Sequence, residues 1–225
     1  MDAEKRAWAE IDLDAVENNI RRIREYVGEK PQILGVVKAD AYGHGFFEVA
    51  KVLLKNGADR LAVACIDEAL QLRRCGVLCP VLILGNTDSK YAQQMVDCDI
   101  TPCCYSYELV SAMSRAALKL NKRAKVHIKI DTGMGRIGLR YTESEDVNKE
   151  TVDTILKMAV LPGVDIEGIF THFSVADDTS EDDYTYLQFQ RFTGICDRLK
   201  ENGLDIPIKH CCNSAALIRF PQMHL

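Results

Sequence analysis

The chain has 225 residues, of which 47% are hydrophobic, and its formal net charge is −5 at pH 7. This length and apolar content allow a large core, in one α/β barrel or in two small domains. Charges of both signs are spread along the chain without a basic block, which argues against nucleic acid or an anionic membrane as a partner.

The sequence predicts a protein of the cytoplasm. No stretch approaches the roughly 18 consecutive apolar residues of a membrane span. The charged start, residues 1–6, has no apolar signal core behind it. The nine cysteines are an odd number, include two neighbouring pairs and form no CxxC motif. This pattern favours reduced, mostly buried thiols over a disulfide framework or a metal site.

Apolar, β-branched segments alternate with longer segments of helical periodicity. Strands are expected at residues 33–39, 60–65, 81–85, 101–105, 126–131, 166–173 and 208–212. Helices are expected at residues 15–27, 46–56, 67–75, 89–97, 107–120, 144–159 and 184–202. Glycines follow four of these helices, as expected at helix C-termini: Gly28, Gly57, Gly76 and Gly203.

Strict alternation of strand and helix implies parallel strands with right-handed crossovers, in a barrel or a doubly wound sheet. No Gly-x-Gly-x-x-Gly follows the first strand, so a (β/α)8 TIM-type barrel is favoured over a dinucleotide-binding sheet. Seven strands are found, so the α/β barrel, over residues 13–225, is expected to be truncated before the eighth strand. Residues 1–12 include a strand-like segment that is expected to pair with a C-terminal β domain absent from this chain.

Lys38 stands at the end of the first apolar strand, and a turn rich in Gly, Asp and Tyr follows it in the run GVVKADAYGHG, residues 35–45. A lysine at the mouth of a buried sheet is partly desolvated. Desolvation lowers the pKa of an amine and makes the amine a usable nucleophile or base. The alternative for an isolated lysine is a strand end that points into water.

A second polar cluster follows the fifth strand, in the run HIKIDTGMGRIG, residues 127–138. Period-two alternation places His127, Lys129 and Asp131 on one face of that strand. Ionisable groups on a buried strand are costly unless they pair with one another or with a ligand, so an internal Lys129–Asp131 ion pair is the alternative to a ligand site. The Gly-rich turn delivers Arg136, whose planar fork suits a carboxylate or phenolate oxygen.

Polar residues also end the last two strands. His172 follows the sixth strand, where a histidine among apolar neighbours is usually a core residue. His210, Asn213 and Ser214 follow the seventh. The Asn-Ser pair is either a plain helix N-cap or, with free backbone N–H groups, a phosphate contact.

Together these motifs resemble the bacterial alanine racemases. The KADAYGHG and DTGMGR runs and the opening AEIDL occur in the order and rough spacing of the N-terminal barrel of that family, from Trp8 onward. The resemblance implies an isomerase that uses pyridoxal 5'-phosphate (PLP) to interconvert L- and D-alanine. It also implies a homodimer that supplies D-alanine for peptidoglycan.

By this resemblance, Lys38 would hold PLP as a Schiff base and act as the catalytic base on one face of the substrate. Further cofactor contacts would be Tyr42, His172, Asn213 and Ser214. Arg136 and Met134 would bind the substrate. The residues expected to support the site from behind are Lys129, which is carbamylated in some members of the family, Asp131 and His210.

In the family, the second base is a Tyr from the C-terminal β domain of the partner subunit. The chain alone is therefore expected to racemise poorly. Two alternatives remain at this point: a serine racemase of the same fold, and a non-catalytic PLP-binding homeostasis protein of similar length. Proteins of the latter type lack the two motifs present here.

Overall fold

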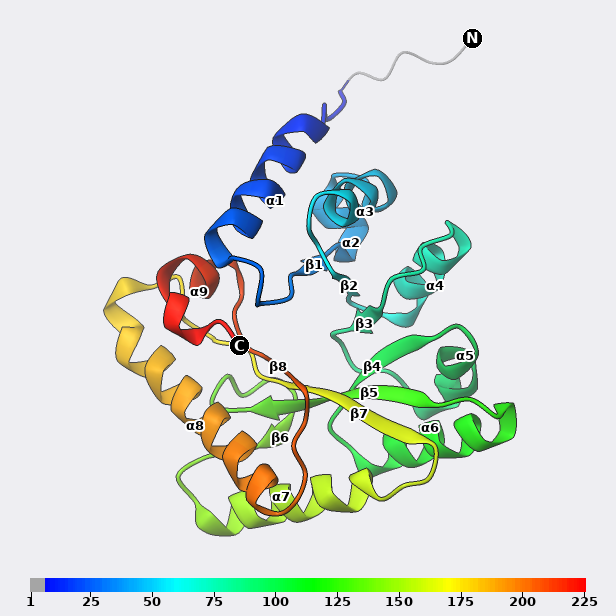
Figure 1. Ribbon diagram of the computed structural model, residues 1–225, viewed down its shortest axis with the longest axis vertical. Helices are drawn as coiled ribbons and strands as arrows, with labels where there is room; N and C mark the ends of the chain where they lie inside the picture. Colours follow the sequence, from blue (N-terminus) through cyan, green and yellow to red (C-terminus); the bar gives the residue numbers. More distant parts are fainter. Residues whose placement is uncertain (1–6) are drawn as a thin grey trace.

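Parallel strands form a curled sheet at the centre of the molecule (Figure 1). The computed structural model describes residues 7–225. The strands pair in the order β1-β2-β3-β4-β5-β7-β8, so each lies beside its predecessor in this series. They are β1 (Leu34–Val36), β2 (Arg60–Val63), β3 (Val81–Ile83), β4 (Ile100–Cys104), β5 (Ala124–Asp131), β7 (Val164–Phe170) and β8 (Ile208–His210). A two-residue strand, β6 (Leu139–Arg140), pairs with the end of β5.

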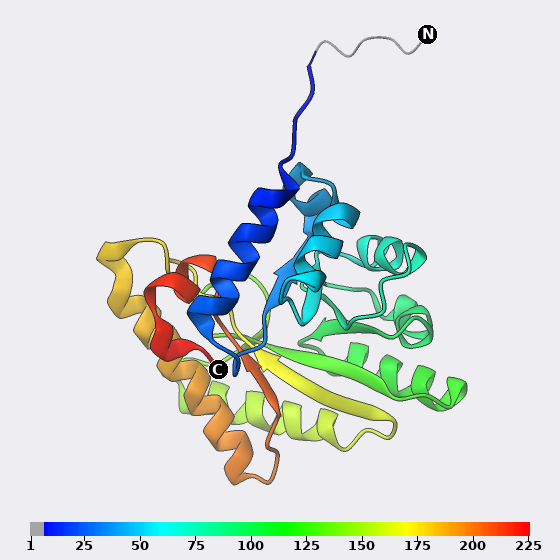
Figure 2. The same ribbon diagram turned by 45° about the horizontal axis from the view of Figure 1, so that its top comes forward.

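Helices cover the outer side of the curled sheet, as the turned view makes plain (Figure 2). They are α1 (Leu13–Val27), α2 (Lys38–Gly43), α3 (Phe46–Lys55), α4 (Ile66–Arg74), α5 (Ala92–Asp97), α6 (Tyr107–Leu120), α7 (Glu145–Ala159), α8 (Asp182–Glu201) and α9 (Ser214–Arg219). Three 3-10 turns are η1 (Ser89–Tyr91), η2 (Thr179–Glu181) and η3 (Pro221–Met223). The result is an incomplete α/β barrel, whose outer strands are β1 and β8.

The strands are apolar because both of their faces are covered, as is usual for parallel sheets. Every residue of β3 and β4 is buried. Large side chains from the helices, including Met113, Met158 and Phe192, are fully buried against the sheet. Polar caps fix the helix starts: the Asp12 carboxylate accepts from the amides of Asp14 and Ala15 at the start of α1.

The predicted fold class is confirmed, including the count of seven main strands. The predicted strands generally extend past the observed C-terminal ends, because the residues after β1, β2, β3, β7 and β8 turn into loops that face the site. The short strand β6 was not predicted from the sequence. The glycines predicted at helix C-termini all have positive φ: Gly28, Gly57, Gly76 and Gly203.

Residues 7–12 form neither helix nor strand, so the expected strand is not present in the described part of the N-terminus. Residues 1–6 of that prediction lie outside the described residues, and the pairing with a further β domain stays a prediction. All nine cysteines are free thiols, as predicted. Only part of the burial prediction holds, because Cys65 and Cys75 are exposed.

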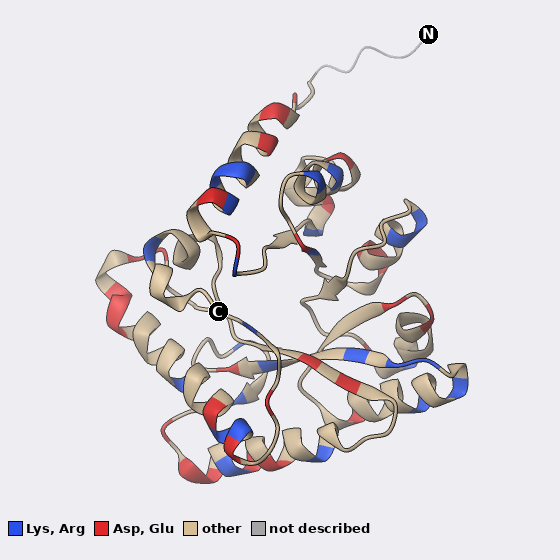
Figure 3. Cartoon of the chain, in the orientation of Figure 1, with Lys and Arg blue, Asp and Glu red and all other residues tan. Residues whose placement is uncertain are grey.

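Positively and negatively charged residues are interspersed along the helices and strands (Figure 3). No helix within residues 7–225 has the length and apolar character needed to cross a membrane.

Candidate active site

The turn that carries Lys38 has left-handed backbone geometry. Ala39, Asp40, Ala41 and Tyr42 have φ between 51° and 56° and ψ between 37° and 51°. For L-residues this conformation costs about 1–2 kcal/mol per residue, and four in succession are unusual. The turn makes α2 a sharp left-handed loop between β1 and α3. It leaves Lys38 partly buried and Tyr42 exposed, with the Lys38 Nζ 5.8 Å from the centroid of the Tyr42 ring.

Two carboxylates hold this turn in place. Glu68, in the first turn of α4, accepts from the amide of Ala39 through Oε1 and from the amide of Ala64 through Oε2, both at 2.7 Å. Asp40 accepts from the amide of Phe46 at 2.8 Å and so caps the start of α3. Glu68 thereby ties the residue after Lys38 to the end of β2.

The loop after β5 is organised by Asp131. Its Oδ1 accepts from the amides of Gly133 and Gly135, each at 3.0 Å. Asp131 forms no salt bridge with Lys129 within the described chain, so the internal ion pair considered from the sequence is not formed. At Gly138, with φ +129°, a Cβ would lie 2.6 Å from the Asp131 amide nitrogen, so only glycine fits beside the end of β5.

Helix α8 supports the same loop from outside the barrel. The Tyr184 hydroxyl donates to the Gly133 carbonyl at 2.8 Å, and Arg191 donates to the Thr132 carbonyl at 3.0 Å. Gln188 is fully buried, and its Nε2 donates to the Thr132 hydroxyl and the His172 carbonyl, both at 3.3 Å. These side chains join the loops that follow β5 and β7.

Lys129 is buried within β5, and its Nζ donates to the Ile130 carbonyl at 2.9 Å. Burial lowers the pKa of the Lys129 amine to about 8. Its Nζ also lies 5.2 Å from the centroid of the Phe170 ring. The Lys129 amine therefore loses its proton at a lower pH than the amine of an exposed lysine does.

His172 lies among the cationic side chains of the site. Burial, followed in order of effect by the positive charges of Lys129, Arg136 and Lys38, lowers the pKa of His172 to about 4. These three groups come from the ends of β5 and β1, so the structure gathers them around a neutral imidazole. No salt bridge is formed by any of the three within residues 7–225.

The end of β8 leads into α9. Asn213 accepts from the amide of Ala216 at 2.9 Å through its side chain, which is the plain N-cap considered from the sequence. Its Nδ2 also reaches the Phe173 carbonyl at 3.5 Å. Ser214 is exposed beside this cap, and Met134 is half-buried in the loop after β5.

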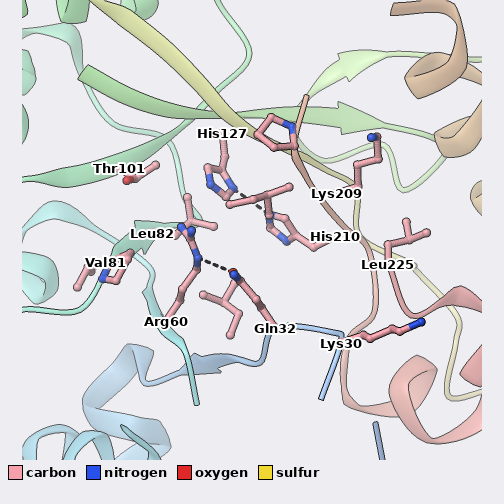
Figure 4. A pocket seen from close by; sticks show the side chains of 14 residues that line it. Lys30, Gln32, Arg60, Val81, Leu82, Thr101, His127, Lys209, His210 and Leu225 are labelled. Atoms are coloured by element: carbon pink, nitrogen blue, oxygen red, sulfur yellow. Dashed lines mark hydrogen bonds between the residues drawn. The ribbon is translucent and has the colours of Figure 1, made fainter. Parts of the chain in front are cut away.

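A separate cavity of about 240 Å³ is lined by Arg60, His127 and His210, among others. Figure 4 shows the hydrogen bond between the two imidazoles and the contact of Arg60 with Gln32. Of the site residues predicted from the sequence, only His210 lines it. Because Leu34, Arg60, Val81 and Ile208 are the first residues of their strands, the cavity lies at the N-terminal ends of the strands, opposite the end that carries Lys38.

A family model described as "Alanine racemase, N-terminal domain" matches residues 11–225. The chain belongs to this family. The alanine racemase of Methanococcus maripaludis is 49% identical over 218 residues, which cover 97% of this chain and 57% of the relative. Alanine racemase 1 of Oceanobacillus iheyensis is 47% identical over 219 residues, with 97% and 56% covered.

Solved structures of the alanine racemase family agree with the fold. The alanine racemase of Clostridium difficile 630 in complex with cycloserine has a TM-score of 0.91 at 41% identity, over 99% of this chain and 59% of that one. The alanine racemase of Bacillus anthracis with bound L-Ala-P has a TM-score of 0.85 at 36% identity, over 98% and 55%. The chain thus spans a little over half the length of these relatives.

Proposed function

We propose that the protein is a PLP-dependent alanine racemase, to which this chain contributes the barrel with the cofactor lysine. The observation that carries the proposal is the group of Lys38, Lys129 and Arg136 around the neutral His172, at the C-terminal ends of parallel strands. Catalytic groups of α/β barrels lie at this end. Membership of the alanine racemase family supports the choice of reaction.

The residues present fit PLP. The cofactor brings an aldehyde, a phenolic oxygen and a phosphate. The site offers a lysine amine, an Arg136 that forms no salt bridge within residues 7–225, and the exposed residues Tyr42 and Ser214 with their hydroxyls. When bound, PLP would delocalise the negative charge left on the substrate after removal of its α-proton. Lys38 would hold the cofactor, with Tyr42 and Ser214 at its phosphate.

The remaining residues would bind and orient the alanine substrate. Arg136 would pair with the alanine carboxylate, and Met134 would contact the substrate beside it. The Lys38 Nζ would take or return the α-proton on one face. His172, being neutral, would line the site without adding charge, and Asn213 would lie at its edge.

Lys129, Asp131 and His210 would act from behind the substrate. The lowered pKa of Lys129 leaves a fraction of free amine near pH 8, which is the form that carbamylation requires. Asp131 would keep the loop that carries Arg136 in shape through its two glycine amides. The second base would come from outside this chain, in a homodimer of the whole protein in the cytoplasm.

Cofactor capture tests the proposal. The purified chain is mixed with PLP, reduced with borohydride and digested, and the modified peptide is identified by mass spectrometry. We expect PLP on Lys38 and none in Lys38→Ala, whereas Lys51→Ala, which removes an exposed lysine of α3, should label normally. Labelling spread over surface lysines would contradict the assignment of Lys38.

The activity has its own test. The whole protein should racemise L-alanine faster than L-serine, and the 225-residue chain should racemise both poorly because the second base is missing. Since cycloserine is bound in a related structure, it serves as a probe that should inhibit the whole protein. A preference for L-serine would move the assignment to the serine racemases.

A further inference from the structure

A chain of buried and partly buried polar groups runs from Arg60 to His210. Arg60, at the start of β2, donates two hydrogen bonds to the Glu167 carboxylate, at 3.0 and 3.2 Å. Glu167 Oε2 lies 3.4 Å from His127 Nε2. His127 Nδ1 lies 2.9 Å from His210 Nε2. The chain therefore joins strands β2, β7, β5 and β8.

The steric fit around His127 is close. A Cβ on Gly168 would lie 2.4 to 2.7 Å from three atoms of the His127 ring, so the ring occupies space that only a glycine leaves free. The His127 side chain is 3% exposed. On the other side, the His210 ring stacks on Phe170, with centroids 4.6 Å apart and an angle of 4° between planes.

Each hydrogen bond in this chain needs one donor and one acceptor. The Glu167 carboxylate is ionised, because hydrogen bonds from His127 and Arg60 lower its pKa to about 2. An ionised carboxylate only accepts, so His127 Nε2 must carry a proton. Burial lowers the pKa of His127, which favours the neutral ring and leaves its Nδ1 as an acceptor.

The proton between the two rings then belongs to His210. We propose that Glu167, acting through His127, fixes His210 as the tautomer with a protonated Nε2 and a free electron pair on Nδ1. In this role Glu167 and His127 are positioning residues. Arg60 holds the carboxylate in register, and Gly168 leaves the space in which the His127 ring takes its place.

This tautomer determines which kind of group can form a hydrogen bond with His210 Nδ1. That partner must be a hydrogen-bond donor, such as a guanidinium or a backbone N–H group, because two acceptors would repel. This inference rests on the proposed function only in placing His210 behind the cofactor. The assignment of the tautomer depends on the protein contacts alone.

Nitrogen-15 NMR of the full chain, labelled at its five histidines and free of PLP, tests the proposal. Two-bond correlations between the carbon-bound protons and the nitrogens of each histidine ring distinguish the two neutral tautomers from each other and from the imidazolium. Signals are assigned by their loss in His127→Gln and His210→Gln. We expect both rings to be neutral with protonated Nε2. A protonated Nδ1 on His210, or a charged His127, would overturn the proposal in the unmodified chain.

Two variants test the role of Glu167. Glu167→Gln replaces the carboxylate by a group that offers both a donor and an acceptor, so the single His210 tautomer should become a mixture. Gly168→Ala displaces His127 without removing a titratable group and should have the same effect. The control is Glu145→Gln, which breaks another Glu–Arg pair, with Arg198. An unchanged His210 spectrum in both variants would show that Glu167 does not set the tautomer.

Because the NMR spectrum is recorded without PLP, it tests the His210 tautomer independently of cofactor binding by Lys38. If PLP fails to label Lys38, the tautomer result still stands. If the tautomer is wrong, cofactor capture by Lys38 is unaffected.

Discussion

Replacement of Glu68 by Gln should loosen the turn that carries Lys38. The Glu68 carboxylate accepts from the amides of Ala39 and Ala64 at 2.7 Å. A glutamine has the same shape but a single acceptor oxygen, so one of the two amides would face an NH2 group. The change therefore removes one hydrogen bond and the negative charge, with little change in packing.

The magnitude follows from the geometry of the turn. Four left-handed residues cost about 1–2 kcal/mol each, so roughly 4–8 kcal/mol must be offset by contacts of the turn. A hydrogen bond to a charged group contributes about 1.5–3 kcal/mol. Because Glu68 is half-buried, we expect Glu68→Gln to cost about 1–2 kcal/mol, towards the lower end of that range.

Two measurements can detect the stabilisation that the turn loses in Glu68→Gln. Urea unfolding reports the free energy of unfolding if the turn and the fold are lost together. PLP titration reports a weaker affinity, by about tenfold for 1.4 kcal/mol, if only the turn opens. The control is Glu48→Gln, which breaks a half-exposed pair with Lys51 on α3 and should change stability by less than about 0.5 kcal/mol.

The reasoning fails if Glu68→Gln matches the unmodified chain in both measurements. Such a result would mean that the left-handed turn is held by its own backbone bonds and by Asp40, and that the contact of Glu68 with Ala39 adds nothing.

Three further predictions concern buried groups. The Lys129 pKa of about 8 lies below its unfolded value, so between pH 8 and pH 10 the unfolded chain binds more protons than the folded chain, and the free energy of unfolding should rise with pH. In urea unfolding, Lys129→Met should flatten this rise and be more stable than the unmodified chain at pH 7. The His172 pKa of about 4 also lies below its unfolded value, so stability should fall as pH drops from 6.5 to 4, and His172→Gln should reduce that fall in the same assay. Gly168→Ala should destabilise by about 1–3 kcal/mol through overlap with the His127 ring. By contrast, Gly194→Ala, in helix α8 with its nearest contact at 3.8 Å, should stabilise slightly; equal melting temperatures for the two would contradict this account.

The alternation of strands and helices could be predicted from the sequence because each buried parallel strand is an apolar segment between turn residues. β5 is the clearest case: its eight residues carry the apolar Val126, Ile128 and Ile130 at every second position. The site residues could be placed at strand ends for the same reason. Their partners could not, because Gln188 and Tyr184 reach the loop after β5 from 51 or more residues away.

The left-handed turn was also beyond the sequence. Ala39 and Ala41 carry no signal for positive φ, which is read from glycine or asparagine. Glu68, which accepts from the amide of Ala39, is a residue of another α/β unit that nothing local distinguishes from Asp67, the other acid of α4. Glu167 was missed for a related reason: its partners His127 and Arg60 lie on β5 and β2, and only the curl of the sheet brings them together.

The order of strands in the sheet also bears on how the protein is made. Apart from the short β6, each strand pairs with the strand that precedes it in the chain. As a ribosome releases the polypeptide, every new strand therefore finds its pairing edge already synthesised, an order that allows the barrel to be built one unit at a time from β1. The proposed ligand site, whose residues follow β1, β5, β7 and β8, can be complete only when the last of these units has docked.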